Sequence, residues 1–183
     1  MKKIIILVFL FLSFQSFAQT QIHFINGYTQ DSIKAIPKGQ RPNPTAYWEK
    51  QYIEKHLKEF QKGASFITSK EILDKYGRKM LGRPNGQFVM SKKQMDKLLK
   101  QAKGRLDFIE TQLGIPAGLW KDKTLVRIDI PEPQKLNLRI PDGNEGGAND
   151  LWLPGGKLPT GYSEAVLNQI PEGSYTENTM ILK

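Results

Sequence analysis

The spacing of hydrophobic and polar positions predicts four helices, all of them before residue 114. The predicted helices comprise residues 46–61, 71–76, 91–104 and 106–113. In the third of these, Met95, Leu98 and Ala102 recur at helical spacing and form one apolar stripe. Ser91 and Gln94 before that stripe predict a capping box.

Shorter runs of alternating or continuous apolar residues predict strands, most of them in the second half. The predicted strands comprise residues 64–68, 87–90, 125–130, 136–140, 151–153, 164–170 and 175–182. In residues 125–130, Val126, Ile128 and Ile130 share one face, which is typical of a strand with one buried side. The pattern predicts one α+β domain over residues 45–183, with N-terminal helices packed on a mostly antiparallel C-terminal sheet.

The first 18 residues have the composition of a secretory signal peptide. Lys2 and Lys3 form a basic start, residues 4–12 are apolar, and Ala18 offers a small residue for cleavage. We therefore expect a secreted or periplasmic protein with no transmembrane segment after signal removal. Residues 19–44 are polar and rich in Pro and Gly, and we expect an irregular lead-in.

Charge and cysteine content narrow the possible chemistry. Loss of Lys2 and Lys3 lowers the basic count from 27 to 25 against 18 acidic residues, so the mature net charge is about +7. This charge favours acidic partners such as nucleic acid, phosphorylated cofactors or anionic envelopes, although it also suits simple solubility. The absence of cysteine excludes disulfides, thiol catalysis and lipid attachment through cysteine.

Familiar catalytic motifs are missing from the sequence. His23 and His56 lack metal-ligand spacing, and no HExxH, Walker or GxSxG motif occurs. The position of His56 on an apolar helix face favours a packed histidine. Zinc and serine-hydrolase chemistry are therefore poor candidates.

Candidate functional residues concentrate in residues 125–171, where short strands alternate with Gly- and Pro-rich loops. The loop 141–150 contains Asn144 and Glu145 among three glycines, which would let the backbone approach a ligand closely. Its spacing is not that of a calcium-binding EF-hand. An ordinary solvated loop is the alternative.

Glu164 is the carboxylate that most suggests catalysis. It begins a predicted strand after Gly161-Tyr162-Ser163, where a carboxylate could stabilise an oxocarbenium-like carbon during glycosidic bond cleavage. The alternative is an exposed charge that protects an edge strand.

Arginines and aromatic residues could bind the rest of a nucleotide. Arg83, Arg127 and Arg139 could pair with phosphate, whose geometry suits the guanidinium fork. Trp152, together with Phe88 and Tyr162, could stack on a base. Surface ion pairs and core packing are the ordinary alternatives for these residues.

Six segments together resemble a known class of proteins. They are GASFITSKEILDKYGR, GRPNGQFVM, LGIPAGLW, LVRIDIP, LNLRIPDGNEGGANDLWLPGG and GYSEAVLNQIP. The residue types in these segments and their order along residues 60–178 resemble those of C-terminal effector domains of bacterial polymorphic toxins of the Rhs or contact-dependent type. Such domains normally follow large delivery regions, whereas this chain has a signal peptide.

Many domains of that class have an ADP-ribosyltransferase-like fold, a split α+β core with a cleft for NAD. The resemblance implies that Glu164 is the glutamate that lies late in the sequence of such domains and lines the NAD cleft. It also implies that Arg127 or Arg83 is the cation that binds the nucleotide. It also implies Ser65 as the strand serine and a cognate immunity protein as a partner. The sequence departs from the pattern in having no Glu-x-Glu pair and no Ser-Thr-Ser run.

Three functions follow as hypotheses. The first is a toxin-like enzyme that uses NAD as substrate, with Glu164 and Arg127 catalytic and with binding roles for Arg83, Ser65, Arg139, Asn144, Glu145 and Trp152. The second is a ribonuclease, and the third is a non-enzymatic envelope binding module. Convergence of Arg127, Glu145 and Glu164 in one pocket would favour an enzyme, and their separation would favour the binding module.

Overall fold

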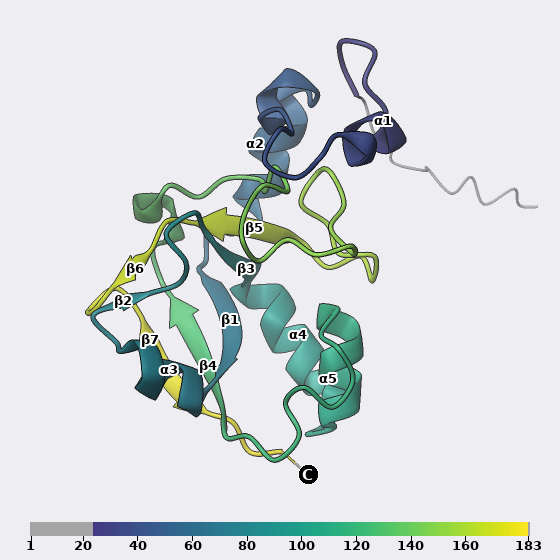
Figure 1. The fold of residues 1–183 in the computed structure, drawn as a ribbon. Coiled ribbons are helices and arrows are strands. Elements are labelled where there is room, and N and C mark those ends of the chain that lie inside the picture. Colours follow the sequence, from purple (N-terminus) through teal and green to yellow (C-terminus); the bar gives the residue numbers. More distant parts are fainter. Residues whose placement is uncertain (1–23, 183) are drawn as a thin grey trace, which may run out of the picture.

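A five-stranded antiparallel sheet forms the centre of the α+β fold (Figure 1). The computed structural model describes residues 24–182. The strand order is β5-β3-β1-β4-β7, and β2 pairs with β6 in a second, two-stranded sheet. The strands are β1 (Ala64–Ser69), β2 (Met80–Leu81), β3 (Gln87–Ser91), β4 (Leu125–Ile130), β5 (Glu164–Leu167), β6 (Ile170–Pro171) and β7 (Thr176–Thr179).

The helices cover the two faces of this sheet unequally. They are α1 (Gln30–Ala35), α2 (Lys50–Lys58), α3 (Lys70–Tyr76), α4 (Lys92–Ala102) and α5 (Leu106–Leu113), with 3₁₀ turns at Pro44–Ala46 and Pro133–Leu136. On one face, α4 and α5 bury Met95, Leu98 and Ile109 against Ile67 and Leu125 of the sheet. This packing confirms the apolar stripe predicted for α4.

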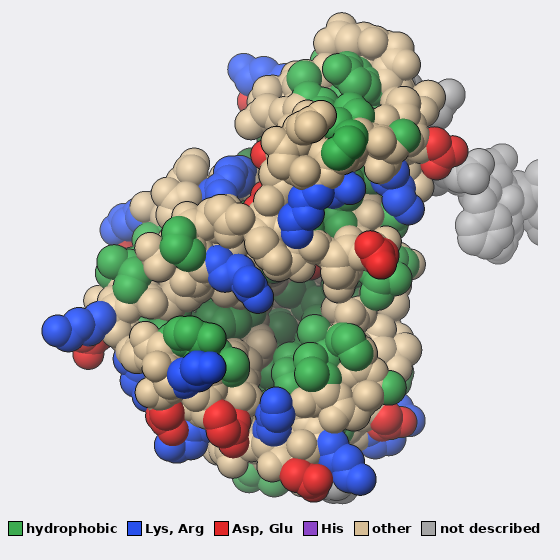
Figure 2. Space-filling view, in the orientation of Figure 1, with side chains coloured by type: hydrophobic (Ala, Val, Ile, Leu, Met, Phe, Trp, Pro, Cys, Tyr) green, Lys and Arg blue, Asp and Glu red, His purple; other side chains and the backbone are tan. Residues whose placement is uncertain are grey.

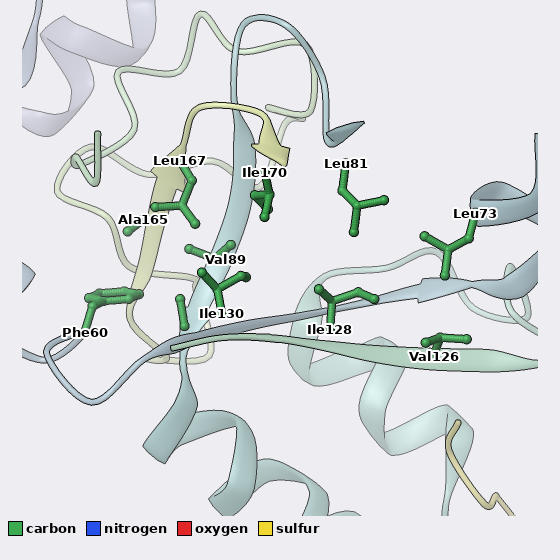
Figure 3. Close-up of a cluster of buried hydrophobic side chains, with 11 residues drawn as sticks. Phe60, Leu73, Leu81, Val89, Val126, Ile128, Ile130, Ala165, Leu167 and Ile170 are labelled. Atoms are coloured by element: carbon green, nitrogen blue, oxygen red, sulfur yellow. The ribbon is translucent and has the colours of Figure 1, made fainter. Parts of the chain in front are cut away.

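The opposite face is covered by α3 and the small sheet. Figure 3 shows the buried side chains on this face: Phe60, Leu73, Leu81, Val89, Val126, Ile128, Ile130, Ala165, Leu167 and Ile170. The three residues from β4 among them are those predicted to share a face. Arg127 and Asp129, which alternate with them, therefore project to the α4 side.

The sheet is split between its central strand, β1, and the neighbouring strand β3. β1 and β3 pair only through Ala64 with Ser91 and Ser65 with Met90. Beyond that point β1 continues along β4 to Ser69, whereas β3 continues along β5 to Gln87. The two strands diverge, and the gap between them opens a cleft in the molecule.

Two predicted strands are absent from the described structure. In residues 136–140, Leu136 is the last residue of a 3₁₀ turn and Asn137 has a φ of 53°. The segment is therefore bent and contributes only an isolated bridge from Arg139 to Val166. Residues 151–153 lie in a turn region where Trp152 is buried among aromatic residues. Burial of one large side chain, and not strand pairing, explains the apolar character of that segment.

Helix starts also differ from the prediction. The lead-in contains α1, whose capping box is formed by Thr29 and Ser32. The predicted capping box at α4 is wrong, because the side chain of Ser91 makes no capping hydrogen bond and the side chain of Gln94 accepts from the N–H of Ser163 instead.

The predicted signal peptide, residues 1–18, lies outside the described residues.

Candidate functional site

A cleft opens where β1 and β3 diverge. Figure 2 shows a hollow with apolar walls between the positions that α3 and α5 occupy in Figure 1. Two adjoining hollows of about 190 and 160 Å³ share Gln87, Phe88 and Glu164 in their linings. They also share the apolar side chains of Leu113, Ile115 and Leu158. Glu164 is therefore an acid in a largely apolar cleft.

The backbone of Glu164 is held on three sides. Its N–H donates to the carbonyl oxygen of Gly156 at 2.7 Å. Its carbonyl oxygen accepts from Nε2 of His56 at 2.8 Å. Strand pairing places Glu164 opposite Met90 of β3. A carboxylate on so firmly held a backbone has a defined direction.

The side chain of Glu164 is largely withdrawn from water but still lines the cleft. Burial, reinforced by the negative charge of Glu145, raises the pKa of Glu164 to about 7. The carboxyl group is therefore close to half-ionised at neutral pH. A group with this property can accept or donate a proton, or stabilise a cation when ionised.

Glu145 belongs to the glycine-rich loop 141–150, and it is almost fully buried. Its carboxylate accepts hydrogen bonds from the backbone N–H groups of Asp142 at 3.2 Å and Gly143 at 2.9 Å. Burial raises the pKa of Glu145, and Asp142 adds to that effect. Glu145 thus shapes its own loop and repels the charge of Glu164.

Residues of the N-terminal lead-in hold the loop 141–150 through hydrogen bonds, which the sequence did not predict. Oδ1 of Asn144 accepts from the N–H groups of Gly39 and Arg41, and Nδ2 of Asn144 donates to the carbonyl of Arg41. The guanidinium of Arg41 donates to the carbonyl of Gly143 and lies 4.5 Å from the ring centre of Trp152. The side chain of Asn144 is therefore already hydrogen-bonded to the lead-in.

Glycine is required where the chain passes between Glu145 and β5. Gly86 has a φ of +134°, and a Cβ atom there would lie 2.4 Å from Cγ1 of Val166. It would also lie 3.3 Å from Cγ of Glu145. The absence of a side chain at Gly86 therefore lets β3, β5 and the loop meet at the cleft.

Aromatic residues and Arg83 complete the cleft. Phe88 and Trp152 line the larger hollow, and the backbone of Gly147 packs close to the Phe88 ring. Nε1 of Trp152 is buried and has no hydrogen-bond partner within the described residues. Arg83 lines this hollow and also a third, larger groove next to it. The position of Arg83 suits an anionic group that spans the two.

Arg127 does not lie beside Glu164 as predicted, whereas Ser65 lines one of the two hollows that Glu164 lines. Arg127 forms ion pairs with Asp96 at 2.7 Å and Asp129 at 2.8 Å. Ser65 is fully buried and donates to Asp129, although it contributes to the inner lining of the cleft. β3 and β1 separate β5 from β4, so Arg127 lies about 14 Å or more from Glu164 at ordinary strand spacing.

Of the three residues chosen to test for one pocket, only Glu164 lines the cleft. Glu145 acts on it electrostatically, and Arg127 belongs to a separate ion-pair cluster. Arg139 bonds Asn168 and the carbonyl of Asn137. Neither Arg127 nor Arg139 lines the two Glu164 hollows. The cation in the cleft is Arg83.

The sequence also gave no indication of a polar cluster around the buried Ser163, next to Glu164. Oγ of Ser163 donates to Glu59 at 2.7 Å and accepts from Nζ of Lys157 at 2.6 Å. Gln94 accepts from the Ser163 N–H at 2.6 Å. The cluster joins α2 and α4 to the start of β5. The sequence signal for it is weak, because its members are up to 104 residues apart.

Comparison with known proteins gives no family assignment. No known protein family matches the chain, and no curated protein is significantly similar to it in sequence. Residues 24–182 contain no group of three His, Cys, Asp or Glu side chains arranged to hold a metal ion. Within the same residues, no helix combines the length and apolarity needed to cross a membrane.

Proposed function

We propose that this protein is an enzyme that cleaves NAD at the bond between nicotinamide and ribose. Arg127 and Glu145 do not join Glu164 in one pocket, which taken alone favours the binding module, but Arg83 lines the cleft and supplies the cation expected of Arg127. The observation that carries the proposal is the firmly held carboxyl group of Glu164 within an apolar cleft. The polymorphic-toxin resemblance is part of the same proposal and supplies the choice of NAD over other glycosides. Hydrolysis and ADP-ribosyl transfer share the bond-breaking step.

Glu164 would act in its ionised form. As the bond to the nicotinamide nitrogen breaks, the electron pair leaves with nicotinamide and positive charge develops on the ribose. Nicotinamide departs as a neutral molecule, so the step needs no proton donor. A carboxylate in an apolar cleft stabilises the developing cation more strongly than one in water. Water or an acceptor group then attacks the ribose carbon.

The split sheet suits the amide group of nicotinamide. Phe66 to Ser69 pair with β4 on one side, while β3 has diverged from the other. In an antiparallel strand, backbone N–H and C=O groups point alternately to either side. An amide ligand offers one acceptor and a pair of donor hydrogens, the complement of such an edge. Phe88 supplies an apolar surface for the ring.

Arg83 would hold the phosphates, the role first considered for Arg127 or Arg83. Arg127 is neutralised by Asp96 and Asp129, whereas Arg83 lines the open cleft. A guanidinium pairs well with phosphate oxygens. The proposal therefore uses Glu164 and Arg83 and assigns Arg127 to the fold.

Ribonuclease activity is the second candidate, and the net charge of about +7 without Lys2 and Lys3 favours it. A histidine acid–base pair cannot include His56, because Nε2 of His56 bonds the backbone and burial lowers its pKa. A ribonuclease would have to use Glu164 as its acid or base. In a toxin-like setting, the protein would be exported and could have an immunity partner.

Product analysis separates these functions. Purified protein is incubated with NAD and, separately, with a mixed RNA substrate, and both reactions are followed by chromatography. The proposal predicts release of nicotinamide and intact RNA. RNA cleavage without nicotinamide release would favour the ribonuclease, and neither reaction would favour the binding module.

A further inference from the structure

A larger hollow lies beside the Glu164 cleft and is not used by the bond-breaking step. It is a groove of about 690 Å³ over α3 and β2. Gln87 lines this groove and both Glu164 hollows, while Arg83 lines the groove and the larger Glu164 hollow. The groove therefore adjoins the proposed site.

Apolar side chains in the groove are unusually exposed. Ile72 is 47% exposed, Tyr76 is 71% exposed and Met80 is 49% exposed. Together with Phe66 and Leu81 they line the groove. Exposed apolar residues gathered in one depression indicate a binding surface.

The charges and polar groups around the groove favour a nucleotide over a purely apolar ligand. Arg83 lies at the junction with the Glu164 cleft, and Nζ of Lys75 lies 5.2 Å from the ring centre of Tyr76. Thr68 and Gln169 also line the groove. A flat base with polar edges would find both apolar faces and hydrogen-bonding groups here, and its phosphates would lie toward Arg83.

We propose that this groove, defined by Ile72, Tyr76, Met80 and Arg83, binds a purine nucleoside diphosphate moiety. The inference rests on the proposed function, because in NAD that moiety is the half remaining after nicotinamide leaves. The Glu164 cleft and the groove then form two arms of one elongated site. Arg83 holds the phosphates at their junction.

Binding of ADP tests the groove without any turnover. The dissociation constant is measured by calorimetry for wild type, Ile72→Asp and Tyr76→Ala, with thermal melts to verify folding. Both residues are largely exposed, so the variants should fold. ADP should bind wild type, and each variant should weaken binding at least about 10-fold, the scale of one lost stacking contact.

A matched control locates the effect. Leu119 is 49% exposed and does not line the groove, so Leu119→Asp should leave the ADP dissociation constant within about 3-fold. No ADP binding by wild type, or a loss of binding in Leu119→Asp as large as that in Ile72→Asp, would overturn the proposal.

The outcome is separable from that of the proposed function. If NAD is not consumed but ADP binding shows the expected pattern, the groove assignment stands and the reaction is wrong. If NAD is consumed while ADP binding ignores Ile72 and Tyr76, the reaction stands and the groove assignment is wrong.

Discussion

Nε2 of His56 donates a hydrogen bond of 2.8 Å to the backbone carbonyl oxygen of Glu164. A carbonyl can only accept, so Nε2 of His56 carries a proton, as it does in the Nε2–H tautomer of a neutral imidazole. Burial lowers the pKa of His56, which is consistent with the neutral form. A helix near the N-terminus thereby fixes the backbone of the carboxylate on which the proposed function depends.

Core packing gives the first prediction. Leu98 is fully buried between α4 and the sheet, so Leu98→Ala should lower the free energy of unfolding by about 2–5 kcal/mol. Leu119→Ala, at a half-exposed position, is the control and should change it by less than about 0.5 kcal/mol. Chemical denaturation measures both. If Leu98→Ala lowered the free energy of unfolding as little as Leu119→Ala does, the apolar stripe of α4 would not be part of the core.

The close packing of Gly86 against Val166 gives the second prediction. Gly86→Ala introduces a Cβ atom against Val166 at a positive φ, and should destabilise the fold by about 1–3 kcal/mol. Gly173 also has a positive φ, but a Cβ atom there meets nothing within 4 Å. Gly173→Ala should therefore cost less, since only the backbone term remains. Equal losses in denaturation experiments would mean that Gly86 is not crowded.

The raised pKa of Glu164 makes stability depend on pH. Its folded-state pKa of about 7 lies above the ordinary value of 4.5, so the folded protein binds more protons between these pH values. The contribution of Glu164 to the free energy of unfolding is therefore greatest below about pH 4.5, and it is lost as the pH rises through about 7.

Glu164→Gln should therefore be more stable than wild type at pH 8, by on the order of 2–3 kcal/mol. The advantage should shrink toward pH 4.5, because both side chains are then neutral. Glu177→Gln, on the opposite edge strand, is the control and should show no such gain, since Glu177 pairs with Arg78. Thermal melts across this range measure the difference, and a wild type at least as stable at pH 8 would contradict the burial of the charge.

Export gives the fourth prediction. Protein produced with residues 1–18 and exported by its own signal should begin at Gln19. Intact-mass measurement of the exported product tests this directly. Exported protein that retains Met1 to Ala18 would show that this segment is not a cleaved signal.

Local periodicity sufficed to predict much of the fold. The alternation in β4 predicted its buried face, and helical spacing predicted α4 and α5. It failed where apolar residues serve isolated burial, as Trp152 does, and where a left-handed residue such as Asn137 bends the chain. The central position of β1, a strand from the first half, also reflects long-range pairing that spacing cannot reveal.

The candidate site was predicted only in part. The unusual loop context of Glu164 identified it, although burial, and not an exposed edge, explains its character. Arg127 was chosen as an available cation, but Asp96 on α4 neutralises it. The sequence carries no signal for the role of Arg41, because its partners, Gly143 and Trp152, lie about a hundred residues away.

The rate of NAD cleavage by wild type and Glu164→Gln, measured from pH 5 to pH 9, tests the central claim most directly. Because the carboxylate is the active form, the wild-type rate should rise through about pH 7 and level off above it. At pH 8, Glu164→Gln should be slower by roughly 10²–10³-fold and lack this rise. Equal rates for the two proteins, or a wild-type rate that falls as pH rises through 7, would contradict the role of Glu164 as the carboxylate that stabilises the ribosyl cation.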